Sequence, residues 1–333
     1  MYTKSISLAL FLLAFTSAAF ANIWIVDNNP FPAGDYTTLA AAHSVASPGD
    51  TIYVYPSATA YAGITVTKRL SFIGAGFDLE IYGGQATTAN TTISGTMKFN
   101  AGSEGSVLEG FDGVFKVDIN TDNITIKRNE LSKVEIGGSN CYILQNEIVA
   151  SLNFQASIWV TAGGLGNIII ANNKIRNTSY GDDGILSNST SQLVVVNNVI
   201  RASDDALSGF SSTSLIQNNI ITGGGIGQNG NYQYNMCNAD QLPNGGVGNI
   251  ENIDMTIVFE DPSNFNTGLH LLPGSPAIGA GFGGTDMGIY GGDTPFIDGG
   301  YPGLPAVFQI EAQVITIPQN GLEVNFQAKS NAQ

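Results

Sequence analysis

The feature that most constrains this chain is a short motif that recurs along its middle third. Five segments each combine a β-prone run with Asn, any residue and an aliphatic: NITIKRNEL, NCYILQNEI, NIIIANNKI, QLVVVNNVI and SLIQNNII. The recurring residues are Asn129, Asn146, Asn173, Asn198 and Asn219, at spacings of 17, 27, 25 and 21. These steps are too unequal for a leucine-rich repeat and too short for propeller blades of about 40 residues. They fit stacked coils of short strands joined by turns of different length.

The repeat therefore predicts an all-β fold, a single-stranded parallel β-helix of about ten or eleven coils, roughly 50 Å long at the ordinary inter-strand distance. Its aliphatics are expected to form one inward stack: Leu131, Ile148, Ile175, Ile200 and Ile221. Asn is expected where the chain bends, because Asn tolerates left-handed backbone angles and its side chain can hydrogen-bond along the stack. Gly110 is expected to take the same position in an earlier coil.

The first 21 residues have the pattern of a secretory leader. Lys4 precedes an apolar run, and Ala19-Phe20-Ala21 fits a signal-peptidase site. No later segment approaches 18 apolar residues, so we expect no transmembrane segment. We predict a secreted or cell-surface protein, extracellular or periplasmic, that is monomeric.

The net charge of −15 disfavours nucleic acid as a partner, because nucleic-acid binders need basic patches. Cations and neutral or weakly charged partners are more compatible with such a chain. The two cysteines, Cys141 and Cys237, are too few for a disulfide framework. Export permits a bridge between them, and two separate buried residues are the alternative.

The ends of an open stack of strands must be covered. Residues 36–46 (YTTLAAAHSVA) predict a capping helix, with Leu39, Ala42 and Val45/Ala46 on one face and Pro48-Gly49 ending it. We divide the chain into a leader (1–21), an N-terminal strand and capping helix (22–50), a parallel β-helix (51–295) and a short C-terminal β tail (296–333), whose sequence alternates in polarity.

The segment 34–76 resembles the opening of bacterial right-handed parallel β-helix proteins of the pectin-lyase-like superfamily. The resemblance lies in a helix followed by SPGDTIYV, YAGITV and IGAG. HLLPGSPAIGAG (270–281) and TDMGIYGG (285–292) resemble the closing coils of that family, and the tail resembles those of secreted Bacteroidetes-type proteins. The resemblance implies a right-handed β-helix. It does not specify an activity, because this fold hosts lyases, hydrolases, epimerases and proteins without catalysis.

Two acid pairs stand out in a chain with only 12% charged residues. YGDDGI contains Asp182 and Asp183, and ASDDAL contains Asp204 and Asp205, 22 residues later. This offset is close to one coil, so the pairs are expected to stack about 4.8 Å apart. Arg176 and Arg201 each follow a repeat aliphatic and are expected to stack as well.

Four such carboxylates repel one another, and three arrangements would relieve the repulsion. The acids can be solvated on turns, with the two arginines offsetting them. They can form a Ca²⁺ site; no cofactor is otherwise required. One of them can have a raised pKa and serve as a general acid in glycoside hydrolysis. The six residues, Asp182, Asp183, Asp204, Asp205, Arg176 and Arg201, are thus the candidate catalytic set.

The motifs of the family's enzymes are mostly missing. Polygalacturonase-like hydrolases carry Asn-Thr-Asp about one coil before Asp-Asp, whereas Asn120-Thr121-Asp122 lies about 60 residues before Asp182. Their Gly-His-Gly and Arg-Ile-Lys motifs are absent from the sequence. Pectate-lyase-like enzymes pair Ca²⁺-binding acids with a basic residue, which Arg176 or Arg201 could imitate, but the characteristic lyase motifs are absent too.

The segment GQNGNYQYNMCN (227–238) reads as an interruption of the repeat. Its Tyr232 and Tyr234, flanked by amides, are candidate ligand-binding residues, because aromatic rings suit the faces of sugars. The leading hypothesis is an exported or cell-surface β-helix protein that binds polysaccharide or another surface ligand. The alternatives are a polysaccharide lyase or glycoside hydrolase that acts on acidic glycans, and a purely structural rod or adhesin module.

Overall fold

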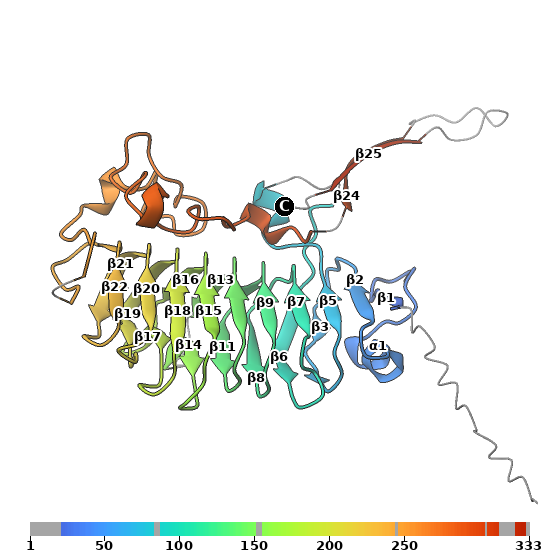
Figure 1. The fold of residues 1–333 in the computed structure, drawn as a ribbon. Coiled ribbons are helices and arrows are strands. Elements are labelled where there is room, and N and C mark those ends of the chain that lie inside the picture. Colours follow the sequence, from blue (N-terminus) through green and yellow to red (C-terminus); the bar gives the residue numbers. More distant parts are fainter. Residues whose placement is uncertain are drawn as a thin grey trace, which may run out of the picture.

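The computed structural model describes residues 21–82, 87–150, 155–243, 246–303, 305–312 and 324–330. The expected leader lies outside these residues except for Ala21. The described chain is mostly β, and its strands run side by side in two long parallel sheets (Figure 1).

Ten strands form the first sheet within the described residues. In spatial order they are β1 (Ile23–Val26), β2 (Thr51–Val54), β5 (Ser71–Ile73), β7 (Val107–Glu109), β9 (Thr125–Lys127), β12 (Tyr142–Leu144), β15 (Ile168–Ala171), β18 (Leu193–Val196), β20 (Leu215–Gln217) and β22 (Asn231–Gln233). Every neighbouring pair is parallel, and the order follows the sequence. Each successive pass of the chain therefore places its strand next to the strand of the preceding pass in this sheet.

Thirteen strands of the described chain form the second sheet. Its strands are β3 (Tyr61–Ala62), β4 (Thr65–Val66), β6 (Ile93–Phe99), β8 (Phe115–Ile119), β10 (Glu130–Leu131), β11 (Lys133–Ile136), β13 (Glu147–Ala150), β14 (Ala156–Val160), β16 (Lys174–Asn177), β17 (Asp183–Leu186), β19 (Val199–Ser208), β21 (Ile220–Ile226) and β23 (Met236–Cys237). The long β19 joins its two halves, because it pairs with β16 near its start and with β17 near its end.

The inward aliphatic stack is confirmed. Leu131 pairs with Ile148, which pairs with Ile175, and the register continues to the next two passes. All five predicted side chains are at most 1% exposed: Leu131, Ile148, Ile175, Ile200 and Ile221. One continuous core runs between the sheets. Helix α1 (Leu39–Val45) packs Leu39 and Ala42 into the first part of this core, together with the following Ala46, whereas Val45 is 45% exposed.

The recurring asparagines form a buried ladder. Asn173 is typical: its Nδ2 donates to Asn198 Oδ1 at 2.9 Å, and its Oδ1 accepts from the backbone nitrogen of Asn146 at 2.9 Å. The ladder extends beyond the predicted positions to Asn235 and Asn249. Hydrogen bonding along the stack is therefore confirmed.

The left-handed backbone lies one residue earlier than expected. Arg128, Gln145, Asn172, Asn197, Asn218 and Tyr234 have φ between 53° and 57°. Gly110, with φ 81°, corresponds to Arg128 and not to Asn129, since the preceding Glu109 pairs with Lys127 in the strand register. The ladder Asn must turn its amide inward to reach the carbonyls of adjacent passes, so the bend falls on the residue before it.

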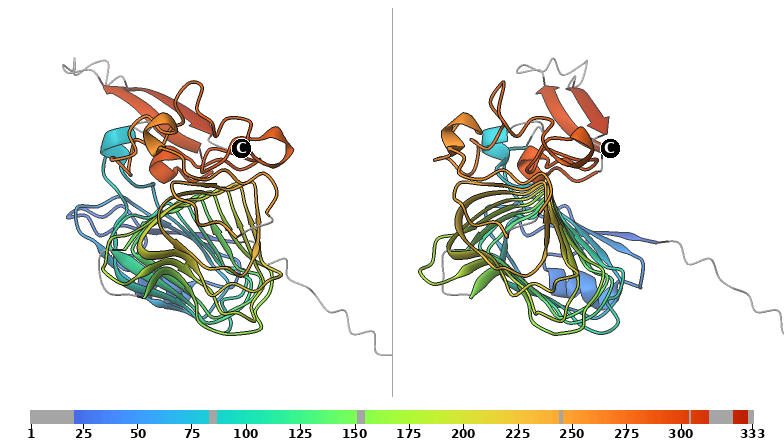
Figure 2. Two further views of the ribbon diagram at one scale, coloured as in Figure 1. Left: turned by 90° about the vertical axis from the view of Figure 1, so that its left-hand side faces the viewer. Right: turned by 60° about the vertical axis from the view of Figure 1, so that its left-hand side comes forward.

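In the described part of the chain, the last strand of the two parallel sheets is β23, which ends at Cys237. Residues 251–303, which we name the return segment, run back along the stacked strands (Figures 1 and 2). This segment contains short 3-10 turns at Met255–Ile257, Phe282–Gly284 and Asp298–Gly300. HLLPGSPAIGAG and TDMGIYGG, expected as closing coils, belong to it. Their many Gly and Pro residues favour turns over further strands.

The return segment covers an apolar row on the outside of the second sheet. Val199, Ile220 and Met236, each directly after a ladder Asn, are buried against it. The segment contributes a second core to this contact: Met255, Val258, Phe259, Phe265, Leu269, Ala277, Met287, Ile289 and Phe296. Burial of these side chains holds the segment in place by the hydrophobic effect.

The left-handed residues also bind the return segment. The Nδ2 of Asn172 donates to the carbonyls of Ile289 and Gly291 at 2.8 and 2.9 Å, and Asn197 donates to Gly291 at 3.0 Å. Asn218 Oδ1 accepts from the backbone nitrogen of Phe282 at 2.8 Å. Earlier passes contact later residues of the segment, so it runs antiparallel to the direction of stacking.

Beyond the return segment, β24 (Pro305–Ala312) and β25 (Val324–Ser330) pair as an antiparallel hairpin. Their alternating sequence had predicted one or two strands here. A short helix, α2 (Leu79–Tyr82), lies beside the end of the return segment, and its Tyr82 hydroxyl donates to the Asn266 carbonyl at 2.8 Å.

Candidate functional site

The two acid pairs lie in register, as their spacing predicted. Ile185 pairs with Leu207, so the 22-residue offset corresponds to one pass of the chain. The backbone nitrogen of Asp205 donates to Asp183 Oδ1 at 3.2 Å, and that of Asp204 donates to the Asp182 carbonyl at 3.3 Å. The four residues therefore meet on neighbouring strands.

The four carboxyl groups differ in environment. Asp182 is 6% exposed and accepts from the backbone nitrogen of Gln155 at 3.1 Å. Asp183 is half-buried and accepts from the Ser208 hydroxyl, and burial raises its pKa. Burial and the neighbouring Asp204 raise the pKa of Asp205. Asp204 itself is exposed.

The arginines also stack in register, Arg176 beside Arg201. The Arg176 guanidinium lies 5.7 Å from the centre of the Phe265 ring in the return segment, and its Nε is buried without a hydrogen-bond partner. Arg201 is exposed. Arg176 is thus engaged by the return segment, which sequence periodicity alone could not predict.

The two candidate ligand-binding tyrosines and the two cysteines are packed within the fold. Tyr232 is 2% exposed in the core, and its hydroxyl donates to the Gly227 carbonyl at 2.8 Å. Tyr234 packs edge-on against Phe282 with ring centres 5.6 Å apart. The segment around them continues the repeat, since Asn235 joins the ladder. Cys141 and Cys237 are both buried and free.

A tryptophan that the sequence reading did not single out lies near the acids. Trp159 on β14 pairs with Glu135 on one side and Leu186 on the other, and Leu186 pairs with Ser208. We name these four residues the Trp159 row. Trp159 is partly exposed, whereas the neighbouring Lys133 is 4% exposed at its side chain, with its Nζ 5.0 Å from the ring centre. The sequence signal for its position is the alternation of side-chain direction in SIWV: with Ile158 and Val160 pointing inward, Trp159 must point outward.

A second cluster of ionisable side chains lies where the return segment crosses the ladder. Lys174 is 1% exposed at its side chain, and its Nζ lies 3.3 Å from Oε2 of the fully buried Glu147 and 4.0 Å from Oδ1 of Asp298. The same ammonium donates to the Asn266 carbonyl and lies 3.4 Å from the Tyr82 hydroxyl.

The carboxylate of Asp298 is bound on both oxygens. The Tyr290 hydroxyl donates to its Oδ1 at 2.9 Å, and His270 Nε2 lies 3.1 Å from its Oδ2. The rings of His270 and Tyr290 stack with centres 4.3 Å apart. His270 thus helps to hold Asp298.

Burial strongly raises the pKa of two glutamates of this region, Glu147 and Glu130. It raises the pKa of Glu147 to about 7, against the opposing effect of Lys174. It raises the pKa of Glu130 to about 9, assisted by the charges of Asp112, Glu147 and Asp78. Glu147 Oε1 and Asp78 Oδ2 are buried without a hydrogen-bond partner.

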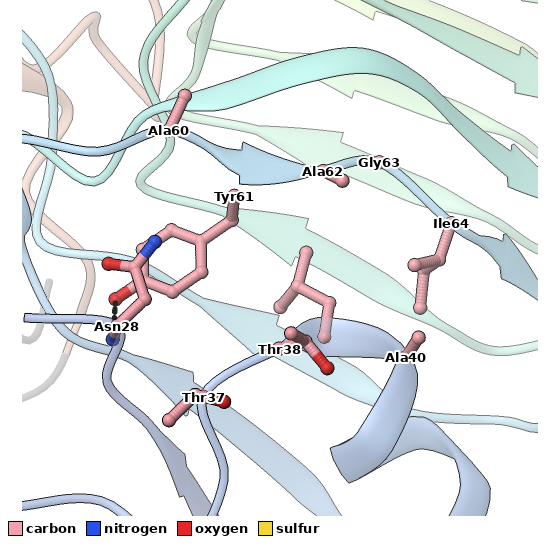
Figure 3. Close-up of a pocket in the computed structure, with 10 residues that line it drawn as sticks. Asn28, Thr37, Thr38, Ala40, Ala60, Tyr61, Ala62, Gly63 and Ile64 are labelled. Carbon is pink, nitrogen blue, oxygen red and sulfur yellow. Dashed lines mark hydrogen bonds between the residues drawn. The ribbon is translucent and has the colours of Figure 1, made fainter. Parts of the chain in front are cut away.

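Among the described residues, no group of three or more His, Cys, Asp or Glu side chains is arranged to hold a metal ion. A cavity of about 390 Å³ lies between α1 and β3 and is lined by residues such as Thr38, Tyr61 and Ile64 (Figure 3). It is remote in sequence from the acid pairs and mostly apolar. In the same residues, no helix has the length and apolar character to cross a bilayer.

Comparison with known proteins returned no matching family model, no matching curated protein and no matching solved structure.

Proposed function

We propose that this chain is an exported right-handed parallel β-helix protein, of the pectin-lyase-like kind, that binds polysaccharide on the outer face of its second sheet. The parallel register over successive passes and the buried asparagine ladder support the fold. Helix α1 would cap its first coil. The leader sequence supports export.

The Trp159 row carries the binding proposal. A partly exposed indole ring, a carboxylate at Glu135 and the Ser208–Asp183 hydrogen bond lie on neighbouring strands of the second sheet. The ring covers the buried Lys133 ammonium, so its other side faces outward. A pyranose can place its C–H face on such a ring and its hydroxyls on the neighbouring oxygens. Trp159 and Ser208 are two strands apart, about 10 Å, which suits an extended chain of sugars.

The substrate class follows from charge. The surface beside Trp159 has several carboxylates, and the whole chain has a net charge of −15. Neutral glycans are therefore favoured over polyuronates, since like charges repel. Ca²⁺ bound by Asp204 and Asp205 would reverse this preference by adding positive charge.

The test is a glycan array on the mature chain, with and without Ca²⁺, followed by calorimetric titration of any ligand found. We expect Trp159→Ala to weaken binding at least tenfold, on the order of 1.5 kcal/mol, because the ring supplies most of the apolar contact. Phe31→Ala is the control, since Phe31 is an equally apolar and 95% exposed ring elsewhere. Unchanged affinity in Trp159→Ala would reject this surface, and an array without any ligand would favour a structural rod.

A polysaccharide lyase or hydrolase is the second candidate. One observation favours it: Asp183 and Asp205 are half-buried on adjacent strands, and burial raises the pKa of both. A carboxyl group that keeps its proton can act as a general acid. Release of unsaturated uronides or new reducing ends, abolished in Asp183→Asn, would establish catalysis. Binding without turnover would support the leading proposal.

A further inference from the structure

The buried lysine beneath the return segment is in an unusual position for a charged group. Lys174 belongs to β16, and the residues that surround its ammonium come from α2, β13 and the return segment. Phe296 lies beside it, with the ring centre 4.5 Å from Nζ. Burial of an ammonium and a carboxylate in such surroundings costs several kcal/mol per ion, even when they are paired.

We propose that Lys174 and Asp298 are joined by an isopeptide bond that ties the return segment covalently to the stacked strands. The Lys174 Nζ and the Asp298 Oδ1 are 4.0 Å apart, and the two side chains are 1% and 25% exposed. A nucleophile and a carboxyl group fixed at such distances react as if at very high concentration, with effective molarities of about 10⁵ M or more in favourable geometries. Formation of a neutral amide also removes the buried charge of Lys174 and the partly buried charge of Asp298.

Glu147 is placed to carry the proton. The Lys174 ammonium gives one proton to the Glu147 carboxylate at 3.3 Å, which leaves a neutral amine. The amine nitrogen then bonds to the side-chain carbonyl carbon of Asp298, and one C–O bond of that carboxyl group breaks. The oxygen leaves as water with two protons, one from Glu147 and one from the nitrogen. In sum, an ammonium and a carboxylate give an amide and water, and Glu147 returns to its starting state.

The geometry selects Asp298 over Glu147 as the carboxyl group that reacts. The Tyr290 hydroxyl donates to Asp298 Oδ1, and His270 lies at hydrogen-bond distance from Oδ2. Donors on a carboxyl group stabilise the negative charge that develops on its oxygen during attack. Glu147 has one oxygen on Lys174 and the other without a partner, so it lacks this polarisation. Burial raises the pKa of Glu147, which suits a group that must take up a proton and release it.

The bond would have a structural consequence. Lys174 and Asp298 are joined through a long stretch of chain, and a cross-link that closes a long loop restricts the unfolded state. It would also fix the return segment over the apolar row of Val199, Ile220 and Met236. An exported protein would gain resistance to local opening and proteolysis.

The decisive measurement is the intact mass of the mature wild-type chain, denatured, with its N-terminus determined. We expect a mass lower than that of the sequence by one water molecule. Digestion with chymotrypsin and tandem mass spectrometry should then find a branched peptide that joins Lys174 to Asp298. Trypsin alone is unsuitable, because no Lys or Arg lies between residues 201 and 329. Lys133, a second buried lysine that is paired with Glu135 at 2.7 Å, is the internal control and should be unmodified.

Two variants test the roles of Asp298 as the reacting carboxyl group and of Glu147 as the proton carrier. Asp298→Ala and Glu147→Gln should both have the full unmodified mass, and the second keeps nearly the same shape. The result does not depend on a variant folding, because the wild-type mass and the branched peptide together decide whether the bond exists. Wild-type protein of full mass would overturn the proposal. A branch at Glu147 would overturn the assignment to Asp298, and a dehydrated Glu147→Gln chain would overturn the role of Glu147.

Discussion

Replacement of Asn173 by Ala is expected to lower the free energy of unfolding by about 4 kcal/mol. The Asn173 amide donates to the carbonyls of Ile143 and Ala171 and to Asn198, at 2.8–3.0 Å. It accepts from Asn146 twice. Alanine would leave these buried partners without hydrogen bonds, and each such group costs about 1–3 kcal/mol. Urea unfolding followed by far-ultraviolet circular dichroism measures the effect.

The matched control is Asn120→Ala. Asn120 is exposed, and its Nδ2 donates to Asn100 Oδ1 at 2.9 Å. Water can replace that single hydrogen bond, so the loss should stay within about 0.5 kcal/mol. Equal effects of the two substitutions would contradict the view that the ladder holds adjacent passes together.

Replacement of Glu130 by Gln is expected to stabilise the protein at mildly alkaline pH and to have little effect in acid. Burial, with the charges of Asp112, Glu147 and Asp78, raises the pKa of Glu130 to about 9 in the folded state. In the unfolded chain the group ionises near its ordinary value of 4.5. The folded protein therefore holds a proton that the unfolded chain releases, and stability falls as the pH rises from about 4.5 towards 9.

Glutamine mimics the protonated acid and removes this dependence. At about pH 8 we expect Glu130→Gln to be more stable than wild type by on the order of 3 kcal/mol, after allowance for screening of a partly exposed group. At about pH 4 the two proteins should have nearly equal stability, because Glu130 is then protonated in both states. Thermal unfolding at both pH values makes the comparison.

The exposed Glu260 supplies the control, as Glu260→Gln should change stability little at either pH. A Glu130→Gln protein that is less stable than wild type at about pH 8 would contradict the raised pKa. A gain of the same size at both pH values would point to improved packing and not to a proton.

Much of the stacked region could be predicted because it repeats. The inward positions of Leu131 and Ile175, and the register that brings Asp205 beside Asp183, follow from the spacing of short motifs. Parallel stacking moves the chain by one inter-strand distance per pass, so equivalent positions must meet. The hydrogen-bonding role of the asparagines followed from the same reasoning.

Two local details were wrong for identifiable reasons. Asn itself was assigned the left-handed bend, but the bend falls on the preceding residue, which can be Arg128 or Gln145 as well as Asn. Residues 227–238 were read as an interruption, because only part of the repeat motif is recognisable there. Tyr232 takes an inward position of the first sheet, where its ring is 2% exposed.

The amino-acid sequence by itself determined the parallel stack, its core and its asparagine ladder, because these depend on contacts that repeat at short, readable intervals. Only the tertiary structure decided where the strands end and what the return segment covers. Its contacts join residues such as Lys174 and Asp298, or Asn172 and Ile289, that are far apart in sequence and follow no period. The return segment runs antiparallel to the direction of stacking. It binds where the stacked strands leave hydrogen-bond donors and apolar side chains uncovered, and these places exist only on the assembled surface.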